Sequence, residues 1–388
     1  MNLSSKMSLL GTESAFDVLV EARALEAQGK DIIHLEIGEP DFDTPEHIRE
    51  AAKKALDDGF THYGPAAGLP ELREAIAADV AQSRNIDVHP DQIVVTPGAK
   101  PIMFFVILAY GEPGAEIIYP NPGFPIYESV IKFSGATPVA APLLEEKDFS
   151  LDIDEFRSLV NDKTRLIIIN SPQNPTGGFI PPEDLEAIAE IAVDRGIPIF
   201  ADEIYSRMLY DDPFSSISAY DGVNEDLIIL DGFSKTYAMT GWRVGYGVMP
   251  KDLATQVARL MVNSNSCTAA FSQMAGIAAL TGPQDESDAM IAEFKRRRDV
   301  FSAGLDQIEG FSCRVPKGAF YLFPNVTGLG KPSLEIENIL LQEAGVASLS
   351  GTGFGEYGEG YLRFSYANSL ENLEEAVARI AACEKLRD

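Results

Sequence analysis

Short apolar runs alternate with longer amphipathic segments through the middle of this chain, and this alternation limits the folds that it can adopt. At least six runs of strand length lie between residues 90 and 250, with helical segments between most of them. The run at residues 165–170 contains four consecutive apolar residues, as expected for a strand that is covered on both faces. Strands that alternate with helices predict an α/β fold around a mostly parallel sheet.

The pattern changes after residue 284. A long amphipathic segment at residues 284–308 is followed by short strand-like runs near 311–315 and 319–323, which indicates a smaller α+β domain. A chain of 388 residues suits one large and one smaller domain. We therefore expect residues 1–45 to form an amino-terminal segment that packs with the small domain, 46–284 the large domain and 285–388 the small one.

The charge balance and the small number of cysteine and histidine residues exclude several classes of function. Acidic residues outnumber basic ones by 59 to 31, a net charge of −28, so we expect neither nucleic acid nor a membrane surface as a partner. Three cysteines and four histidines show no metal-binding or disulfide spacing. The amino terminus has no secretory pattern, and the longest apolar run, residues 102–110, is too short to cross a bilayer. We expect a cytoplasmic protein without a metal.

One lysine occupies an unusual position. Lys235 lies in a glycine-bounded loop between two strand-like apolar runs, residues 227–230 and 244–248. Apolar surroundings lower the pKa of a lysine, and a neutral amine attacks carbonyl groups. Arg243 follows eight positions later, and its fork of donors suits a phosphate. An aldehyde that carries a phosphate, pyridoxal phosphate, fits both. The alternative is that Lys235 and Arg243 simply pair with nearby acids.

Further candidates follow the predicted strands. Asn174 lies in an Asn-Pro-Thr-Gly loop after the run at 165–170, and Asp202 follows the run at 197–201. Gly98 and Ala99 form a turn at the start of a helix, where free N–H groups can bind a phosphate. Each has an ordinary local alternative: a turn asparagine, a helix cap and a plain strand–helix turn. In an open α/β sheet, however, ligands bind at these strand ends.

Taken together, these motifs resemble one family. Ser234-Lys235 followed by Gly241-Trp242-Arg243-Val244-Gly245-Tyr246 is similar to the lysine signature of the class I/II aminotransferases, the fold type I pyridoxal-phosphate enzymes of the aspartate aminotransferase type. The Asp-Glu-x-Tyr motif that ends at Tyr205 and the entrance loop that begins at Gly38 match as well. The resemblance extends from Gly38 to Arg363 in the family order. It implies a mostly parallel seven-stranded sheet in the large domain.

The resemblance also implies a role for each residue. Lys235 holds pyridoxal 5′-phosphate covalently and acts as general base and acid, Asp202 keeps the ring nitrogen protonated, and Tyr205 and Asn174 contact the ring oxygen. Phe124 stacks on the ring. The implied phosphate contacts are Gly98, Ala99, Lys100, Ser234, Arg243 and, from a partner subunit, Tyr63. The implied substrate contacts are Gly38, Asn174 and Arg363, the last gripping the α-carboxylate through two bonds. Pro101 departs from the family pattern and removes one N–H from the phosphate turn.

The implied function is transfer of an amino group between an L-amino acid and a 2-oxo acid, in two half-reactions through pyridoxamine phosphate. The implied assembly is a homodimer with shared active sites. The same residues are compatible with other enzymes of this fold, such as a C–S β-lyase or an enzyme that resembles aminocyclopropane-carboxylate synthase. A DNA-binding regulator with this fold needs an additional basic domain before the site; because Gly38 already belongs to the implied site, we do not expect that class here.

Overall fold

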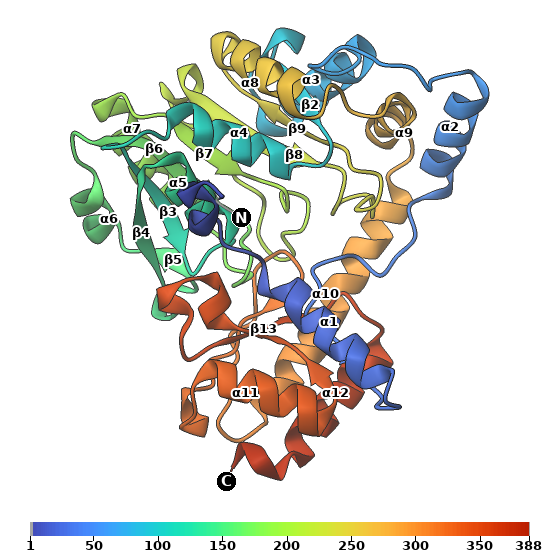
Figure 1. The fold of residues 1–388 in the computed structure, drawn as a ribbon, viewed down its shortest axis with the longest axis vertical. Helices are drawn as coiled ribbons and strands as arrows, with labels where there is room; N and C mark the ends of the chain where they lie inside the picture. Colours follow the sequence, from blue (N-terminus) through green and yellow to red (C-terminus); the bar gives the residue numbers. More distant parts are fainter. Residues whose placement is uncertain (1–2, 388) are drawn as a thin grey trace.

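The computed structural model describes residues 3–387, and its largest element is an eight-stranded sheet (Figure 1). The strands follow the order β2-β9-β8-β7-β6-β3-β4-β5. Their bounds are β2 Ile93–Thr96, β3 Glu116–Asn121, β4 Thr137–Leu144, β5 Ser150–Leu151, β6 Thr164–Asn170, β7 Ile199–Asp202, β8 Leu227–Gly232 and β9 Gly245–Val248.

Most neighbours in this sheet are parallel. The pairs β8–β7, β7–β6, β6–β3 and β3–β4 run parallel, and only β9 and β5 run antiparallel to their neighbours. The predicted α/β class is confirmed. The sheet has one strand more than predicted, because Asp148 and Phe149 adopt left-handed backbone conformations and turn the chain back onto β4. The resulting β5 has two residues, too few for a periodic signal.

Helices cover both faces of the sheet, and strand β6 shows why. Ile167 and Ile169 lie in one core cluster with residues of α2, α3, α7 and α9, whereas Leu166 and Ile168 lie in another with residues of α4, α5 and α8. Alternate side chains of β6 therefore point to opposite faces of the sheet, and both faces are buried under helices. The helices are α2 Glu46–Asp57, α3 Pro70–Arg84, α4 Lys100–Tyr110, α5 Ile126–Ser134, α6 Ile153–Leu159, α7 Pro182–Arg195, α8 Lys251–Ser264 and α9 Ala270–Thr281.

Below this upper body, Figure 1 shows a smaller lower body, which the helix α10 (Asp285–Asp306) joins to it. The lower body contains the antiparallel sheet β10-β13-β12 and its own core. Its other elements are α1 Ser14–Glu26, β1 Ile33–His34, β10 Tyr321–Leu322, α11 Ser333–Ile339, β11 Val346–Ala347, β12 Leu349–Ser350, β13 Leu362–Ser365 and α12 Leu370–Ala382.

The amino-terminal segment joins the lower body through a strand pair. β1 pairs in parallel with β11, and the paired residues are about 310 positions apart in the sequence. Only Ile33 and His34 of this segment pair with β11. The run at 311–315 is not a strand, because its one ladder contact is an isolated bridge between Ser312 and Asn325. The domain boundaries at residues 45 and 284 stay predictions.

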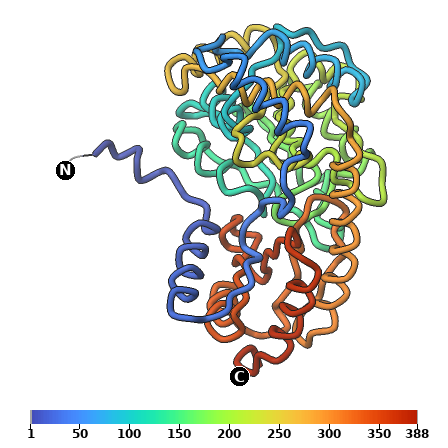
Figure 2. The backbone as a smooth tube through the Cα atoms, turned by 90° about the vertical axis from the view of Figure 1, so that its right-hand side faces the viewer, coloured from blue at the N-terminus to red at the C-terminus, as the bar shows by residue number. Residues whose placement is uncertain are grey.

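Figure 2 shows the stretch before α1 projecting from the body. Its apolar side chains Leu3, Met7 and Leu9 are exposed, and Gly11 N donates to Ser129 Oγ at 2.8 Å. Among the described helices, none has both the length and the apolar character that a membrane span requires.

Candidate active site

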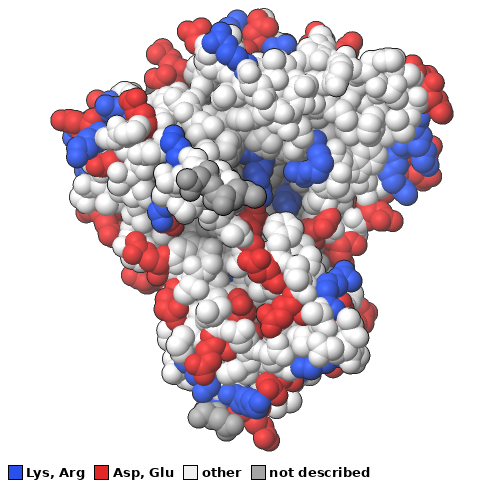
Figure 3. Space-filling model, viewed as in Figure 1, with Lys and Arg blue, Asp and Glu red and all other residues white. Residues whose placement is uncertain are grey.

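A cavity of about 480 Å³ lies at the carboxyl ends of the parallel strands, between the two bodies. Figure 3 shows a hollow at this level, with basic side chains inside it. The ends of β6, β7 and β8 contribute Asn170, Asp202 and Leu230 to its wall. Most of the sequence-predicted site residues line it as well: Gly38, Ala99, Lys100, Phe124, Asn174, Asp202, Tyr205, Ser234, Lys235, Arg243 and Arg363.

Lys235 reaches into the cavity from the loop that follows β8. Its Nζ donates to the carbonyl oxygen of Gly38 at 2.5 Å and lies 5.5 Å from the centre of the Phe320 ring. Burial lowers the pKa of Lys235 to about 8, and the positive charges of Arg363 and Arg243 act in the same direction, while Glu39 opposes them. An appreciable fraction of this amine is therefore neutral near neutral pH, as a nucleophile requires.

Asp202 presents a carboxylate to the same cavity. Tyr127 Oη donates to its Oδ2 at 2.6 Å, and the backbone N–H of Ile204 donates to Oδ1 at 3.3 Å. Burial raises the pKa of Asp202 to about 6, although both hydrogen bonds favour the ionised form. A carboxylate in such a position gains from a cationic N–H partner, because a buried charge is costly until it is paired.

Arg363 and Asn174 meet in another part of the cavity wall. Arg363 Nη1 donates to Asn174 Oδ1 at 3.1 Å, and Nη2 donates to the carbonyl oxygen of Glu36. The guanidinium lies over the ring of Tyr321, 4.6 Å from its centre. Arg363 Nε is buried and has no hydrogen-bond partner in the part of the chain that the structure describes. A buried donor without a partner is costly, so a ligand oxygen that reached this N–H would offset that cost.

Two tyrosines close the wall beside Lys235. The hydroxyl groups of Tyr205 and Tyr321 are 2.8 Å apart, and both rings are buried. A Cβ at Gly38 would clash with the Tyr321 hydroxyl. Glycine at position 38 therefore allows the loop to approach closely enough for its carbonyl to meet Lys235.

At the other end of the cavity, Arg243 faces the start of α4. It lies in a left-handed backbone conformation, and its Nη1 donates to Thr240 O at 2.7 Å. Gly98 has φ +82°, and a Cβ there would clash with the Arg243 guanidinium. Gly98 thus lies beneath Arg243 rather than in the cavity wall. A helix amino terminus and a guanidinium that face one space suit a phosphate. Pro101 occupies the first turn of α4 and supplies no N–H.

Lys100 lies close to the ring of Phe124. Its Nζ pairs with Glu13 and lies 5.4 Å from the centre of the Phe124 ring. The two partners come from segments far apart in the sequence, since Glu13 immediately precedes α1. Lys100 therefore already has an acidic partner, unlike a lysine that is open to a phosphate.

A comparison with known families decides what this arrangement belongs to. The family described as aminotransferase class I and II matches residues 30–380, a span that includes the cavity residues from Gly38 to Arg363. The chain belongs to the class I and II aminotransferases.

Individual relatives agree. The aspartate aminotransferase of Pyrococcus abyssi is 42% identical over 355 residues, which are 90% of this chain and 91% of the relative. The aromatic-amino-acid aminotransferase 2 of Thermococcus litoralis is 39% identical, with 98% of this chain and 97% of the relative covered. The structure of the aspartate aminotransferase from Thermus thermophilus with maleate superposes with a TM-score of 0.93 at 36% identity and covers 98% of this chain and 99% of that one. The enzyme is thus a transaminase with a fold type I structure, and no relative favours the lyase alternative.

In this aminotransferase two sequence-predicted residues do not line the cavity: Gly98, which lies beneath Arg243, and Tyr63. Tyr63 precedes α3 and is 91% exposed, which is unusual for a large aromatic residue. A single chain gives it no role at the site.

Sequence reasoning missed two tyrosines. Tyr127 donates to Asp202, and Tyr321 touches Tyr205, Arg363 and Gly38. Tyr127 lies three positions after Phe124, in the first turn of α5, and its backbone N–H donates to the Phe124 carbonyl oxygen at 3.1 Å. That spacing was a usable signal. Nothing in the local sequence of Tyr321 marks it, because its partners all come from other parts of the chain.

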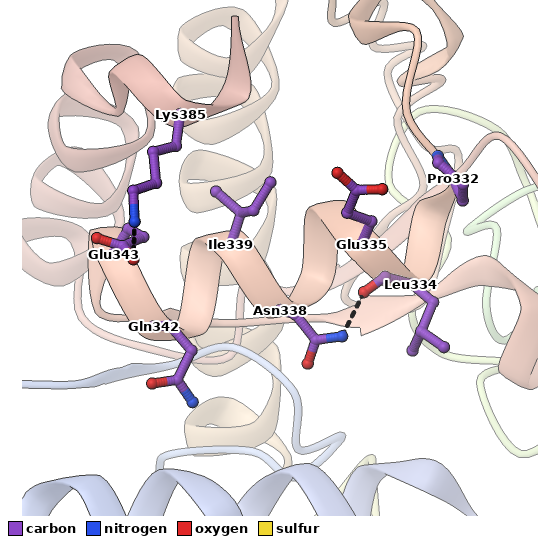
Figure 4. A pocket seen from close by; sticks show the side chains of 8 residues that line it. All are labelled: Pro332, Leu334, Glu335, Asn338, Ile339, Gln342, Glu343 and Lys385. Atoms are coloured by element: carbon purple, nitrogen blue, oxygen red, sulfur yellow. Dashed lines mark hydrogen bonds and ion pairs between the residues drawn. The ribbon is translucent and has the colours of Figure 1, made fainter. Parts of the chain in front are cut away.

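Other hollows carry less chemistry. Figure 4 shows one beside α11, in which Lys385 pairs with Glu343 and Asn338 Nδ2 donates to the Leu334 carbonyl oxygen at 2.8 Å. These contacts are local to the surface of the lower body. Within residues 3–387, no group of three histidine, cysteine or acidic residues is arranged to hold a metal.

Proposed function

We propose that this aminotransferase binds pyridoxal 5′-phosphate in the cavity and exchanges an amino group between an L-amino acid and a 2-oxo acid. The observation that carries the proposal is the position of Lys235: a buried amine with a lowered pKa lies in one cavity with the Asp202 carboxylate and the Arg243 guanidinium. These three groups match an aldehyde, a ring nitrogen and a phosphate.

The residues present fit this cofactor. Arg243 and the start of α4 would hold the phosphate, Asp202 the ring nitrogen, and Asn174 and Tyr205 the ring oxygen, with Phe124 against the ring. When bound, the cofactor supplies an electron-withdrawing ring that stabilises negative charge on the substrate α-carbon. Lys235 Nζ then takes and returns the proton of that carbon.

Substrate binding falls to Arg363. Each Nη of Arg363 carries two N–H groups and donates one of them, to Asn174 or to the Glu36 carbonyl oxygen. The second N–H on each Nη remains for the paired bonds that an α-carboxylate needs. Taking this carboxylate out of water costs free energy, and its pairing with the guanidinium offsets that cost. Burial lowers the pKa of Arg363 itself. All amino acids share this group, so Arg363 sets the substrate class rather than the side-chain preference.

Acidic substrates are the preference that we propose. Among the basic residues of the cavity, Lys100 has no role in the scheme above, and a second carboxylate is a group that it can bind if Glu13 releases it. The names of the relatives from Pyrococcus abyssi and Thermus thermophilus, and the dicarboxylate maleate in the latter structure, support aspartate as a donor. An aromatic preference, as in the Thermococcus relative's name, is the second candidate.

We also propose a homodimer in which Tyr63 serves the partner's phosphate site. Its 91% exposure supports a role outside its own chain. The cytoplasmic location expected from the sequence stays a prediction, supported by three free cysteines, which suit a reducing compartment.

The test is a panel of amino donors with 2-oxoglutarate as acceptor. Conversion of the bound cofactor to its amine form, with release of a 2-oxo acid, is the expected result, and aspartate should be among the best donors. Release of ammonia or a thiol without that conversion would show a lyase instead. Borohydride reduction followed by peptide mapping should place the cofactor on Lys235, and a label on Lys100 would refute the assignment.

A further inference from the structure

Behind the cavity wall, one arginine holds two buried carboxylates. Arg84, the last residue of α3, donates from Nε to Glu203 Oε2 at 3.1 Å and from Nη2 to Asp231 Oδ2 at 2.5 Å. The three side chains are between 4% and 8% exposed. None of them lines the cavity, and the family resemblance gives them no role.

The two carboxylates lie next to the catalytic strand ends. Glu203 follows Asp202 at the end of β7, and Asp231 follows Leu230 in β8, with Asp202 and Leu230 directly opposite each other in the ladder. Asp202 and Leu230 line the cavity. Because side chains alternate across a strand, Glu203 and Asp231 point to the other face, where Arg84 meets them.

The same cluster reaches the lysine loop. Asp231 Oδ1 accepts from the backbone N–H of Gly232 at 2.7 Å, at the point where the chain leaves β8 toward Lys235. Arg84 therefore connects the strand end that carries Asp202 to the one that carries Lys235. A shift of either strand would break one of its two charged hydrogen bonds.

The hydrogen-bond pattern indicates that both carboxylates are ionised. Glu203 Oε1 accepts from Ser216 Oγ at 2.6 Å, and that hydroxyl already accepts from Ser218. Asp231 Oδ2 accepts from Ser206 Oγ at 3.2 Å in addition to Arg84. Each oxygen thus faces a donor, and the permanently charged Arg84 guanidinium holds both groups in the ionised form against burial, which raises the pKa of each.

One guanidinium against two carboxylates leaves a surplus negative charge. Asp79, on the same helix as Arg84, lies close enough for Asp231 to raise its pKa, in addition to the effect of burial. Arg207, the other base near Asp79, is engaged with Asp288. The region around Glu203 and Asp231, next to Asp202 in the sheet, therefore carries more negative than positive charge.

We propose that Arg84, Glu203 and Asp231 form a positioning unit that fixes Asp202 relative to the Lys235 loop and, through its surplus negative charge, strengthens the hold on the proton shared by Asp202 and the cofactor's ring nitrogen. This inference rests on the proposed function, in which Asp202 faces that nitrogen. Burial is the main cause of the raised pKa of Asp202, and the charges of Asp231 and Glu203 raise it further. Protons in this region are therefore bound more tightly because of the unit.

Glu203→Gln tests the charge, because the amide keeps an oxygen for Arg84 and almost the same shape. The holoenzyme is reconstituted with pyridoxal phosphate isotopically labelled at the ring nitrogen, and NMR reports the protonation of that nitrogen. We expect the signal to move toward the unprotonated position and kcat to fall roughly ten-fold, the effect of about one pKa unit. KM for the amino donor should stay unchanged, because Arg363 is untouched.

Two variants serve as controls. Ser216→Ala removes a hydrogen bond to Glu203 without changing its charge, and Glu337→Gln neutralises a buried carboxylate in the lower body that accepts from Ser350. Both should lower the melting temperature without moving the ring-nitrogen signal. If Glu203→Gln does not fold, Asp231→Asn removes the same charge from the other side of Arg84 and should give the same shift.

The outcomes separate this inference from the proposed function. A wild-type protein that takes up no pyridoxal phosphate would refute the function itself. A wild-type protein that transaminates, combined with an unchanged ring-nitrogen signal in both Glu203→Gln and Asp231→Asn, would overturn the inference alone. A signal that moves equally in Ser216→Ala would show that packing, not charge, is responsible, and would overturn it as well.

Discussion

Arg363 Nη1 donates to Asn174 Oδ1 at 3.1 Å, and this hydrogen bond joins β13 of the lower body to the loop that follows β6 of the upper body. The two residues are 189 positions apart in the sequence. Arg363, which is proposed to bind the substrate, is thus oriented by a residue that is proposed to contact the cofactor. Binding of either the substrate or the cofactor should therefore affect the hydrogen bond between Arg363 and Asn174.

Arg363→Lys tests this arrangement. Lysine cannot reproduce the planar fork, and it would lose the bonds to Asn174 and Glu36. We expect kcat/KM to fall by roughly 100-fold or more, about 3 kcal/mol, for acidic, aromatic and aliphatic donors alike. Steady-state kinetics with one donor from each class measures this. If only one class of donor suffers, Arg363 binds the side chain instead of the α-carboxylate.

Tyr127→Phe tests the support of Asp202. The hydroxyl donates to the carboxylate and so favours its ionised form, and its loss should raise the pKa of Asp202 above about 6. Because the hydroxyl also fixes the direction of the carboxylate, we expect bound cofactor but a kcat reduced by roughly ten-fold through misorientation of Asp202, about 1.4 kcal/mol. Tyr119→Phe is the matched control, because Tyr119 is also buried but accepts its hydrogen bond from Asn121. Equal losses in the two variants would contradict a specific role for Tyr127.

The pKa of Lys235 predicts how cofactor uptake depends on pH. Only the neutral amine attacks an aldehyde, so the rate of uptake by the apoenzyme should rise with pH and level off above about 8. An ordinary exposed lysine would show this rise near its usual pKa of about 10.4. Stopped-flow absorbance after addition of pyridoxal phosphate gives the profile, with Lys235→Ala as the control that forms no covalent product. A midpoint near 10 would mean that burial does not control this amine.

Tyr63 predicts an active dimer with composite sites. Subunits of Tyr63→Phe, provided that this variant alone is impaired, are mixed with subunits of Lys235→Ala and allowed to exchange. If Tyr63 acts on the partner subunit's site, each hybrid dimer has one site with both defects and one intact site. Activity should then rise well above that of either parent.

The opposite result is equally clear. If Tyr63 acts within its own chain, every site in a hybrid keeps one defect and no rise occurs. Native mass spectrometry of the mixture establishes that hybrids have formed. A flat activity in such a sample refutes the shared site.

Local sequence was sufficient for the strand ends of the site. Asn174 and Asp202 each follow a continuous apolar run, and the parallel sheet brings such ends together at one edge. The lysine loop was identifiable because a charged residue between two buried strands usually has a function. The α/β class and most helices of the upper body follow from the same periodicities.

Long-range contacts set the limit of prediction. Tyr321 is part of the site only because β10 brings it against Tyr205 and Gly38, and no local pattern encodes that meeting. The Arg84 cluster was missed for the same reason, since a helix-terminal arginine is ordinarily exposed. The two-residue strands β1 and β5 carry no periodic signal of their own, because such short strands depend on the partner strand.

The contrast between an acidic chain and a basic cavity affects how small anions arrive. At −28 the molecule as a whole repels a phosphate or a dicarboxylate at long range. Four basic residues and three acidic ones line the hollow, and Lys235, Arg243 and Arg363 attract the anion once it reaches them. Salt at physiological strength screens charges beyond about 8 Å, so it weakens the distant repulsion more than the attraction at contact. Moderate ionic strength should therefore speed the diffusional encounter with such ligands, the reverse of what a uniformly basic surface would give.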